Sequence, residues 1–232
     1  MKLLEENITQ TIDEIYLLET LNLDNKTILE LGCGGAAMTK KIANNGQNRK
    51  IIACEVDEIQ HKKNLKLNIK NIKFEDYPAE DIKLEDNSID MVLMFKSFHH
   101  IPEENMTKAL AEIKRVLKPN GLAYISEPLY QGEQNALISI FHEEKHEREV
   151  AFEHIKKAVD NEMFKLFKEV FFQTPITYEN FDDFKTKQMD VTHLDNVYSK
   201  QLVQKVKEKY ESYSKGKHTF LKPFRVDILQ KV

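Results

Sequence analysis

Cysteines and long apolar runs are scarce in this 232-residue chain, and each shortage excludes a class of protein. Two cysteines, Cys33 and Cys54, are too few and too far apart for a disulfide scaffold or a structural zinc site of their own. The longest apolar runs, such as 91–95, are far shorter than the roughly 20 residues that a membrane-spanning helix needs. The first ten residues carry acids where a signal peptide would have an apolar core. We therefore expect a cytoplasmic protein with reduced thiols and no membrane partner.

The chain also lacks an excess of charge of either sign. Its 34 Lys and Arg residues against 38 Asp and Glu residues give a formal net charge of −4. Such a balance gives no overall attraction for nucleic acid or for an anionic membrane, so neither is expected as a partner. With 41% hydrophobic residues the chain can bury a sizeable core, and we expect residues 1–232 to fold as one domain.

Strand-like and helix-like patterns alternate along the first half of the chain. Compact apolar runs typical of strands occupy 27–31, 50–55, 72–74, 89–95 and 122–126, with helical spacing at 38–43, 58–66 and 103–117. Strands joined through helices favour right-handed crossovers and a parallel sheet that is covered on both faces. Residues 22–127 are therefore predicted to form an open, doubly wound α/β sheet.

The second half is richer in aromatic side chains, because 15 of the 21 Phe and Tyr residues lie in the last 105 positions. Helical patterns are expected at 3–21, 134–168 and 181–213, and strands at 170–178 and 223–229. We expect residues 1–20 and about 130–215 to form a helical cap over the sheet. The aromatic residues would line its core or a pocket beneath it.

Three of only seven glycines fall within four positions directly after the first strand, in the sequence ILELGCGGA of residues 28–36. Gly32 and Gly34 allow the backbone to turn tightly and to approach a ligand, and the following helix presents free N–H groups. Glu55, at the end of the next strand, can accept the hydroxyl hydrogens of a ribose. The pattern predicts a nucleotide site. Because Gly32-x-Gly34-x-x-Ala37 also fits a loose dinucleotide fingerprint, a NAD-dependent enzyme stays open.

Three further features favour a different nucleotide. Glu30 places a carboxylate beside the loop, where it suits an ammonium group and would repel a pyrophosphate. The strings PAEDIKLEDNSIDMVLMFKSFHHIP, at 78–102, and ALAEIKRVLKPNGLAYISEP, at 109–128, follow in order. With these motifs the chain resembles the class I S-adenosylmethionine-dependent methyltransferases. It is most similar to their small-molecule branch, typified by the ubiquinone and menaquinone methyltransferases.

The resemblance covers residues 27 to about 128, and it implies a Rossmann-like, seven-stranded mixed sheet and S-adenosylmethionine as cofactor. It assigns cofactor contacts to Glu30, Gly32, Cys33, Gly34 and Phe95 for the methionine part, Glu55 for the ribose, and Val56, Ala79, Glu80 and Asp81 for the adenine. Two positions depart from the family pattern. Ala36 stands at a usual glycine, which is tolerable if its φ is negative, and Pro78 replaces an aspartate, which shifts the polar adenine contact onto Glu80 or Asp81.

The resemblance also implies methyl transfer to a small-molecule acceptor. His99 and His100 match the family's pair at the wall between cofactor and acceptor, and Glu127 follows the fifth strand at its carboxyl end. A neutral histidine can remove a proton near pH 7, so we expect His100 and Glu127 to act as the catalytic residues nearest the methyl group. Tyr130 and Glu133 are further candidates for acceptor contacts, and a capping or packing role for either histidine stays open.

Other functions remain open beside this one. A tRNA or protein methyltransferase would use a basic surface, and residues 200–217 hold six lysines, but also two glutamates. The string HEEKH from His142 to His146 matches the HExxH pattern of zinc hydrolases on an expected helix. Because it lacks a third ligand and lies among many charged residues, no metal site is expected. Arg225, inside the run 223–229, is expected on the solvent face of a strand.

Overall fold

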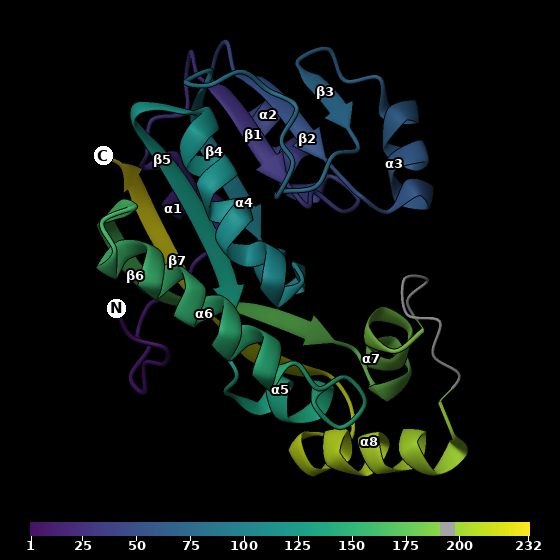
Figure 1. Cartoon of the computed structure of the whole chain (residues 1–232). Helices are drawn as coiled ribbons and strands as arrows, with labels where there is room; N and C mark the ends of the chain where they lie inside the picture. Colours follow the sequence, from purple (N-terminus) through teal and green to yellow (C-terminus); the bar gives the residue numbers. More distant parts are fainter. Residues whose placement is uncertain (191–197) are drawn as a thin grey trace.

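The computed structural model describes residues 1–190 and 198–232, which are built around one seven-stranded sheet (Figure 1). The strands are β1 (Thr27–Leu31), β2 (Lys50–Cys54), β3 (Ile72–Glu75), β4 (Ile89–Phe95), β5 (Leu117–Pro128), β6 (Phe164–Tyr178) and β7 (His218–Lys231). Their order is β3-β2-β1-β4-β5-β7-β6, with β1 to β5 parallel and β7 antiparallel to both of its neighbours. The expected doubly wound, mixed α/β sheet is confirmed.

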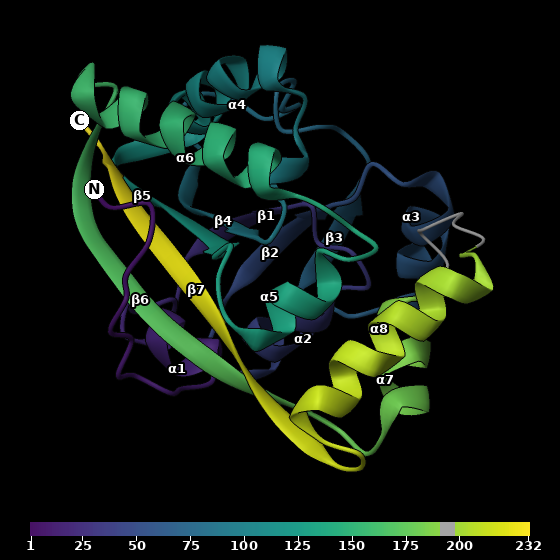
Figure 2. The same ribbon diagram turned by 90° about the horizontal axis from the view of Figure 1, so that it is seen from below.

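Helices cover both faces of the sheet. They are α1 (Glu14–Glu19), α2 (Ala37–Asn44), α3 (Glu58–Asn64), α4 (Glu103–Val116), α5 (Glu133–Ile138), α6 (Lys145–Asp160), α7 (Phe181–Gln188) and α8 (Lys200–Tyr213), with short 3-10 turns η1 (Leu65–Leu67) and η2 (Phe98–His100). Helices α4 and α6 lie on one face, and α1 and α2 lie on the other (Figure 2). None of the helices in the described ranges is long and apolar enough to cross a membrane.

The sheet's strand order fixes where a ligand can bind. β4 is buried at six of its seven positions, which is typical of a parallel strand covered on both faces. The chain turns to opposite sides of the sheet after β1 and after β4, and these two strands are neighbours. A crevice therefore opens at their carboxyl ends, the usual ligand site of such sheets.

The second half adds the long antiparallel pair of β6 and β7, which pairs from Phe164 opposite Lys231 to Tyr178 opposite His218. This pair runs past the parallel strands, and α5, α7 and α8 gather at its far end (Figure 2). They enclose a separate apolar cluster of Leu137, Tyr178, Phe181, Phe184, Met189, Val206, Tyr210 and Phe220. Much of the aromatic content of the second half therefore forms this separate core.

Several expected elements differ from the structure. The helix expected at 3–21 is only α1, because the preceding chain runs alongside β6: the Ile12 N–H donates to the carbonyl of Gln173 in that strand. The helix expected at 134–168 is α5 and α6 followed by the start of β6, whose residues pair with β7. The strand expected at 122–126 is longer, as β5. Within 181–213 the structure has α7 and α8, and residues 191–197 lie outside the described ranges.

Candidate active site

A cavity of about 950 Å³ lies at the carboxyl ends of the central strands. The loop after β1, the end of β2, the first turn of α3 and the chain after β4 form its walls. The lining includes Glu30, Gly32, Cys33, Gly34, Glu55, Val56, Ile59, Ala79, Glu80, Phe95, Lys96, Ser97 and His100. It thus contains nine of the ten residues to which the resemblance assigns cofactor contacts, together with His100. The tenth, Asp81, is exposed and ion-paired with Lys83 instead.

The glycine loop takes a shape that its glycines permit. Gly32 has φ +71°, and a Cβ there would lie 2.6 Å from the Ser97 Cβ, so only glycine fits between the loop and the end of β4. Gly34 has φ +51°, but a Cβ there would meet no atom within 4 Å, because this backbone borders the open cavity. Ala36 has φ +59° at the start of α2, so the negative φ that would make alanine tolerable at this position is not present.

Glu55 holds the glycine loop beside β2. Its Oε2 accepts the Gly34 N–H at 2.7 Å, and its Oε1 accepts the Asp57 N–H at 2.9 Å. Each carboxylate oxygen has a further lone pair that can accept a ribose hydroxyl. The carboxylate therefore has a structural role in addition to any contact with a ligand.

The lining fits the cofactor that the resemblance implies. Glu30 is 2% exposed, and its Oε2 makes no hydrogen bond within the described part of the chain. Burial raises the pKa of Glu30 to about 7, and an ammonium group beside it would favour the ionised form. Val56 and Ile59 also line the cavity and are 60% and 68% exposed, so an adenine ring could cover their apolar side chains. The cavity thus offers a carboxylate for the ammonium group, a second carboxylate for the ribose and apolar side chains for the adenine.

Ala79 and Glu80, to which the resemblance assigns adenine contacts, also line the cavity. The Glu80 carboxylate accepts the Asn105 side-chain amide at 3.0 Å. Cys33 is buried, and burial raises the pKa of its thiol, so it remains a neutral packing group beside the loop.

The structure separates the two expected catalytic residues. His100, in η2, is exposed on the wall of the large cavity. Glu127 is 3% exposed, and its carboxylate turns away from that cavity to contact His99 Nδ1 and to accept the Phe98 N–H at 2.9 Å. Glu127 therefore pairs with His99, and His100 alone faces the cavity.

The pKa values of this group follow from burial and pairing. Burial opposes the charged form of His99, but the Glu127 carboxylate outweighs it and raises the pKa of His99 to about 9. The same pair holds the pKa of Glu127 below its ordinary value despite burial. Burial and then the charge of His99 lower the pKa of His100, so this imidazole is neutral near pH 7.

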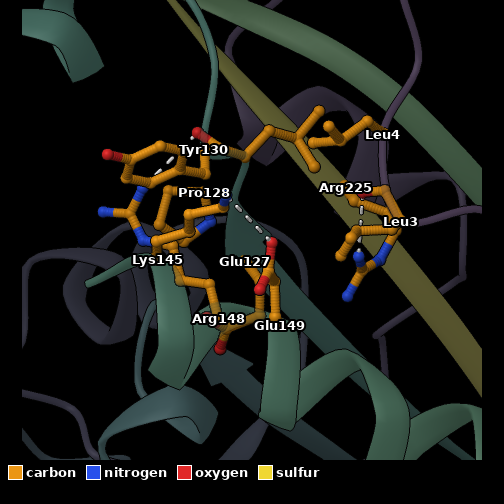
Figure 3. Close-up of a pocket in the computed structure, with 10 residues that line it drawn as sticks. Leu3, Leu4, Glu127, Pro128, Tyr130, Lys145, Arg148, Glu149 and Arg225 are labelled. Atoms are coloured by element: carbon orange, nitrogen blue, oxygen red, sulfur yellow. Dashed lines mark hydrogen bonds and ion pairs between the residues drawn. The ribbon is translucent and has the colours of Figure 1, made fainter.

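Glu127 also lines a smaller cavity of about 250 Å³ (Figure 3). This space is surrounded by side chains from the N-terminal segment, from the end of β5 and the residues after it, from α6 and from β7. Arg225 is 2% exposed, and its Nε donates to Asp227 Oδ2 at 2.8 Å. The expectation that Arg225 faces solvent is wrong, because β7 is an inner strand. Tyr130 lines this cavity, and Glu133 is exposed with His218 at 3.4 Å.

The HExxH string does not form the expected helical pair. Helix α6 begins at Lys145, after Glu143 accepts the Lys145 N–H at 2.8 Å, so His142 precedes the helix that carries His146. Ligand atoms of His99, His100 and Glu144 do lie within 4.8 Å of one another. In the structure Glu144 pairs with Arg148 at 2.5 Å and with His142 at 2.7 Å, so this group is a network of charge pairs.

Several lining residues were not predicted, and Ile59 and Lys96 are two of them. Ile59 lies in the first turn of α3, and Lys96 directly follows β4 at the ligand edge. The position of Lys96 could have indicated it, because the expected strand ended at Phe95. Ile59 could have been found from the start of the helix after Glu55.

Comparison with known proteins matches the part of the chain that builds this cavity. Residues 29–125 match the family model of a methyltransferase domain. The ubiquinone/menaquinone biosynthesis C-methyltransferase UbiE of Rickettsia prowazekii is 33% identical over 115 residues, covering 46% of this chain and 45% of that protein. Phosphoethanolamine N-methyltransferase 1 of Triticum aestivum is 33% identical over 110 residues, covering 45% and 22%. The match thus spans less than half the length of either relative.

The fold is similar to that of solved structures over nearly the whole chain. A SAM dependent methyltransferase from Aquifex aeolicus superposes with a TM-score of 0.59 at 18% identity, covering 95% of this chain and 90% of its own. At this identity the likeness concerns the fold alone. The family model matches residues 29–125, whereas the similarity of fold extends over 95% of the chain.

Proposed function

We propose that the chain is a class I S-adenosylmethionine-dependent methyltransferase and that it transfers a methyl group from this cofactor to a small-molecule acceptor. One observation carries the proposal: a single cavity joins the glycine loop, the Glu55 carboxylate and the His100 imidazole. Cofactor and acceptor would meet where His100 lies.

The residues around the glycine loop would bind the cofactor. Glu55 would accept the ribose hydroxyls, Glu30 would face the ammonium group, and Val56 and Ile59 would cover the adenine. When bound, S-adenosylmethionine supplies a methyl group on a sulfonium, which a nucleophile displaces in line. The chain's contribution is to hold both partners in that alignment and to exclude water.

His100 would remove the proton from an acceptor that has one to lose. Its ring is exposed to the cavity, and its lowered pKa leaves it able to accept a proton near pH 7. Glu127 would be a positioning residue, because it holds His99 and the Phe98 N–H, which fixes the turn that carries His100.

Titration calorimetry tests the cofactor. S-adenosylhomocysteine should bind in the micromolar range, and NAD should not. Glu58→Ala is a control variant and should bind S-adenosylhomocysteine like wild type, since this exposed acid of α3 pairs with Lys62 and does not line the cavity. Binding of NAD without binding of the methyl donor or its product would refute the proposal.

The kind of acceptor needs a separate test. A small molecule is favoured by the net charge of −4 and by the names of the two relatives, which concern a quinone pathway and phosphoethanolamine. Radioactive methyl transfer should therefore label small molecules of a cell extract filtered below about 3 kDa. Labelling confined to tRNA or protein would replace the small-molecule acceptor by a macromolecular one.

A further inference from the structure

We propose that the acceptor carries an acid group, a carboxylate or a phosphate, and that Lys96 and Lys222 bind this group beside the ring of Phe224. The inference rests on the proposed function, since it names the class of molecule that the acceptor site takes. It assigns a binding role to two lysines outside the cofactor contacts.

The two lysines come from different strands and meet at one aromatic ring. Lys96 directly follows β4, and Lys222 lies on β7. Their Nζ atoms lie 5.9 Å and 5.4 Å from the centroid of the Phe224 ring. Phe172 stacks on Phe224 at 5.3 Å with an angle of 16° between the rings, so one face is covered. Both ammonium groups therefore lie within about 6 Å of the centre of one ring.

The charged groups around the two lysines are already paired with each other. Arg148 pairs with Glu144, and His99 pairs with Glu127. Neither Lys96 nor Lys222 makes an ion pair with a carboxylate among residues 1–190 and 198–232. The site therefore holds two cations in excess, which an anion would neutralise.

Glu14 is the other carboxylate near Lys96. It is 7% exposed, and it accepts the Tyr124 hydroxyl at 3.2 Å. Burial raises the pKa of Glu14, although Lys96 opposes this effect. Glu14 is thus biased toward the neutral form, and no ion pair joins it to Lys96 among residues 1–190 and 198–232.

The electrostatics of Lys222 agree with a missing anion. Burial first, and then the charges of Lys96 and Arg148, lower the pKa of Lys222 to about 8, although Glu144 and Glu127 act the other way. An anion within contact distance would stabilise the charged form of this lysine and raise its pKa. The acid group of an acceptor would supply that charge.

Lys96 links this site to the reaction. Its backbone has φ +56°, a left-handed conformation that is uncommon for a long side chain, and its N–H donates to the Ser126 carbonyl at 2.7 Å. Lys96 and His100 both line the large cavity. An acceptor held at its acid group by the lysines would therefore reach the part of the cavity where His100 faces the methyl group.

Nuclear magnetic resonance of lysine side chains tests the site with simple probes. In protein saturated with S-adenosylhomocysteine, the Lys222 Cε resonance should titrate with a midpoint near 8. Inorganic phosphate or acetate at tens of millimolar should raise this midpoint by about one pH unit or more. A response to phosphate alone indicates a phosphate-bearing acceptor, and a response to acetate indicates a carboxylate. Lys209, which lies 4.9 Å from the Tyr213 ring on α8, serves as an internal control and should not respond.

Four variants make the test specific. Lys96→Met should raise the Lys222 midpoint in the absence of anion and remove most of the response to anion, because the second cation is gone. Lys222→Met removes the reporter, so phosphate binding is followed by calorimetry and should weaken at least about tenfold, whereas Lys222→Arg should retain it. Lys209→Met should behave as wild type.

The outcomes separate the inference from the proposed function. If S-adenosylhomocysteine binds but neither anion moves the Lys222 midpoint, the acid-group site is wrong and the methyltransferase proposal stands. An equal response at Lys209 would also overturn the site, since it would indicate general screening. If S-adenosylhomocysteine does not bind, the proposed function fails, and the inference about its acceptor fails with it.

Discussion

The His99 imidazole and the Glu127 carboxylate form a buried pair that joins the chain after β4 to the end of β5. Their side chains are 2% and 4% exposed. Glu127 also accepts the Phe98 N–H, so one carboxylate fixes the first two residues of η2. The third residue of that turn is His100. The pair therefore sets the direction of the residue that faces the cavity.

This pair should make stability depend on pH. Because Glu127 raises the folded-state pKa of His99 from 6.5 to about 9, the folded protein binds this proton more tightly than the unfolded chain. The stabilisation is complete below about pH 6.5 and is lost as the pH rises through about 9. We expect a contribution of about 1–3 kcal/mol to the free energy of unfolding. Urea denaturation of wild type and Glu127→Gln at pH 6 and pH 9.5 measures it.

In Glu127→Gln the free energy of unfolding should fall less between pH 6 and pH 9.5 than in wild type, by about 1–3 kcal/mol. Glu153→Gln is the matched control, because Glu153 is an exposed acid on α6. It should retain the wild-type dependence on pH. Equal slopes for wild type and Glu127→Gln would show that Glu127 does not govern the protonation of His99.

Removal of the Glu55 carboxylate should affect both binding and stability. Glu55→Ala loses two hydrogen bonds to the ribose, so cofactor affinity should fall by about 2–4 kcal/mol. It also frees the N–H groups of Gly34 and Asp57, which should lower the free energy of unfolding by about 1–2 kcal/mol. Calorimetry with S-adenosylhomocysteine and urea denaturation measure the two effects. A dissociation constant within about threefold of wild type would exclude Glu55 from the ribose contact.

The central strands were predictable from the sequence for a simple physical reason. Strands β1 and β4 are covered on both faces, so most of their positions favour an apolar side chain, with Glu30 and Asp90 as exceptions. The expected bounds 27–31 and 89–95 match the structure. The start of β6 was missed because the run 164–168 carries two lysines, and its strand state depends on pairing with β7, 60 residues away along the chain.

The site was only partly predictable. The glycine loop and Glu55 follow strands directly, so their place at the ligand edge follows from the order of elements. The partner of Glu127 could not be predicted from the order of the elements. His99 and His100 are neighbours in a 3-10 turn, where consecutive side chains point about 120° apart. Only the packing of η2 against β5 decides which ring meets Glu127.

His100→Ala should affect the chemical step without affecting the cofactor. If His100 removes the acceptor's proton, kcat should fall by about 100-fold or more, whereas the dissociation constant of S-adenosylhomocysteine should stay within about twofold. Because burial lowers the pKa of His100 from 6.5, the wild-type rate should decline only below about pH 6.5. His146→Ala, at an exposed position of α6, should leave both quantities unchanged. A similar kcat for both variants would remove His100 from proton transfer.

The two glycines of the loop should separate folding from binding. In Gly32→Ala the new Cβ would lie 2.6 Å from the Ser97 Cβ at φ +71°, so we expect a loss of roughly 2–4 kcal/mol in the free energy of unfolding. In Gly34→Ala the Cβ meets no protein atom within 4 Å, and only the strain of φ +51° remains, about 1–2 kcal/mol.

For ligand affinity we expect the opposite order, with Gly34→Ala the more damaging of the two substitutions. The Gly34 Cβ would project into the space beside the loop that the cofactor's methionine part would fill, so the affinity of folded Gly34→Ala for S-adenosylhomocysteine should fall at least about tenfold. Urea denaturation and calorimetry on the two variants measure both quantities. Wild-type affinity in Gly34→Ala would mean that the ligand does not approach the backbone at this glycine, and the loop would then serve only to join β1 to α2.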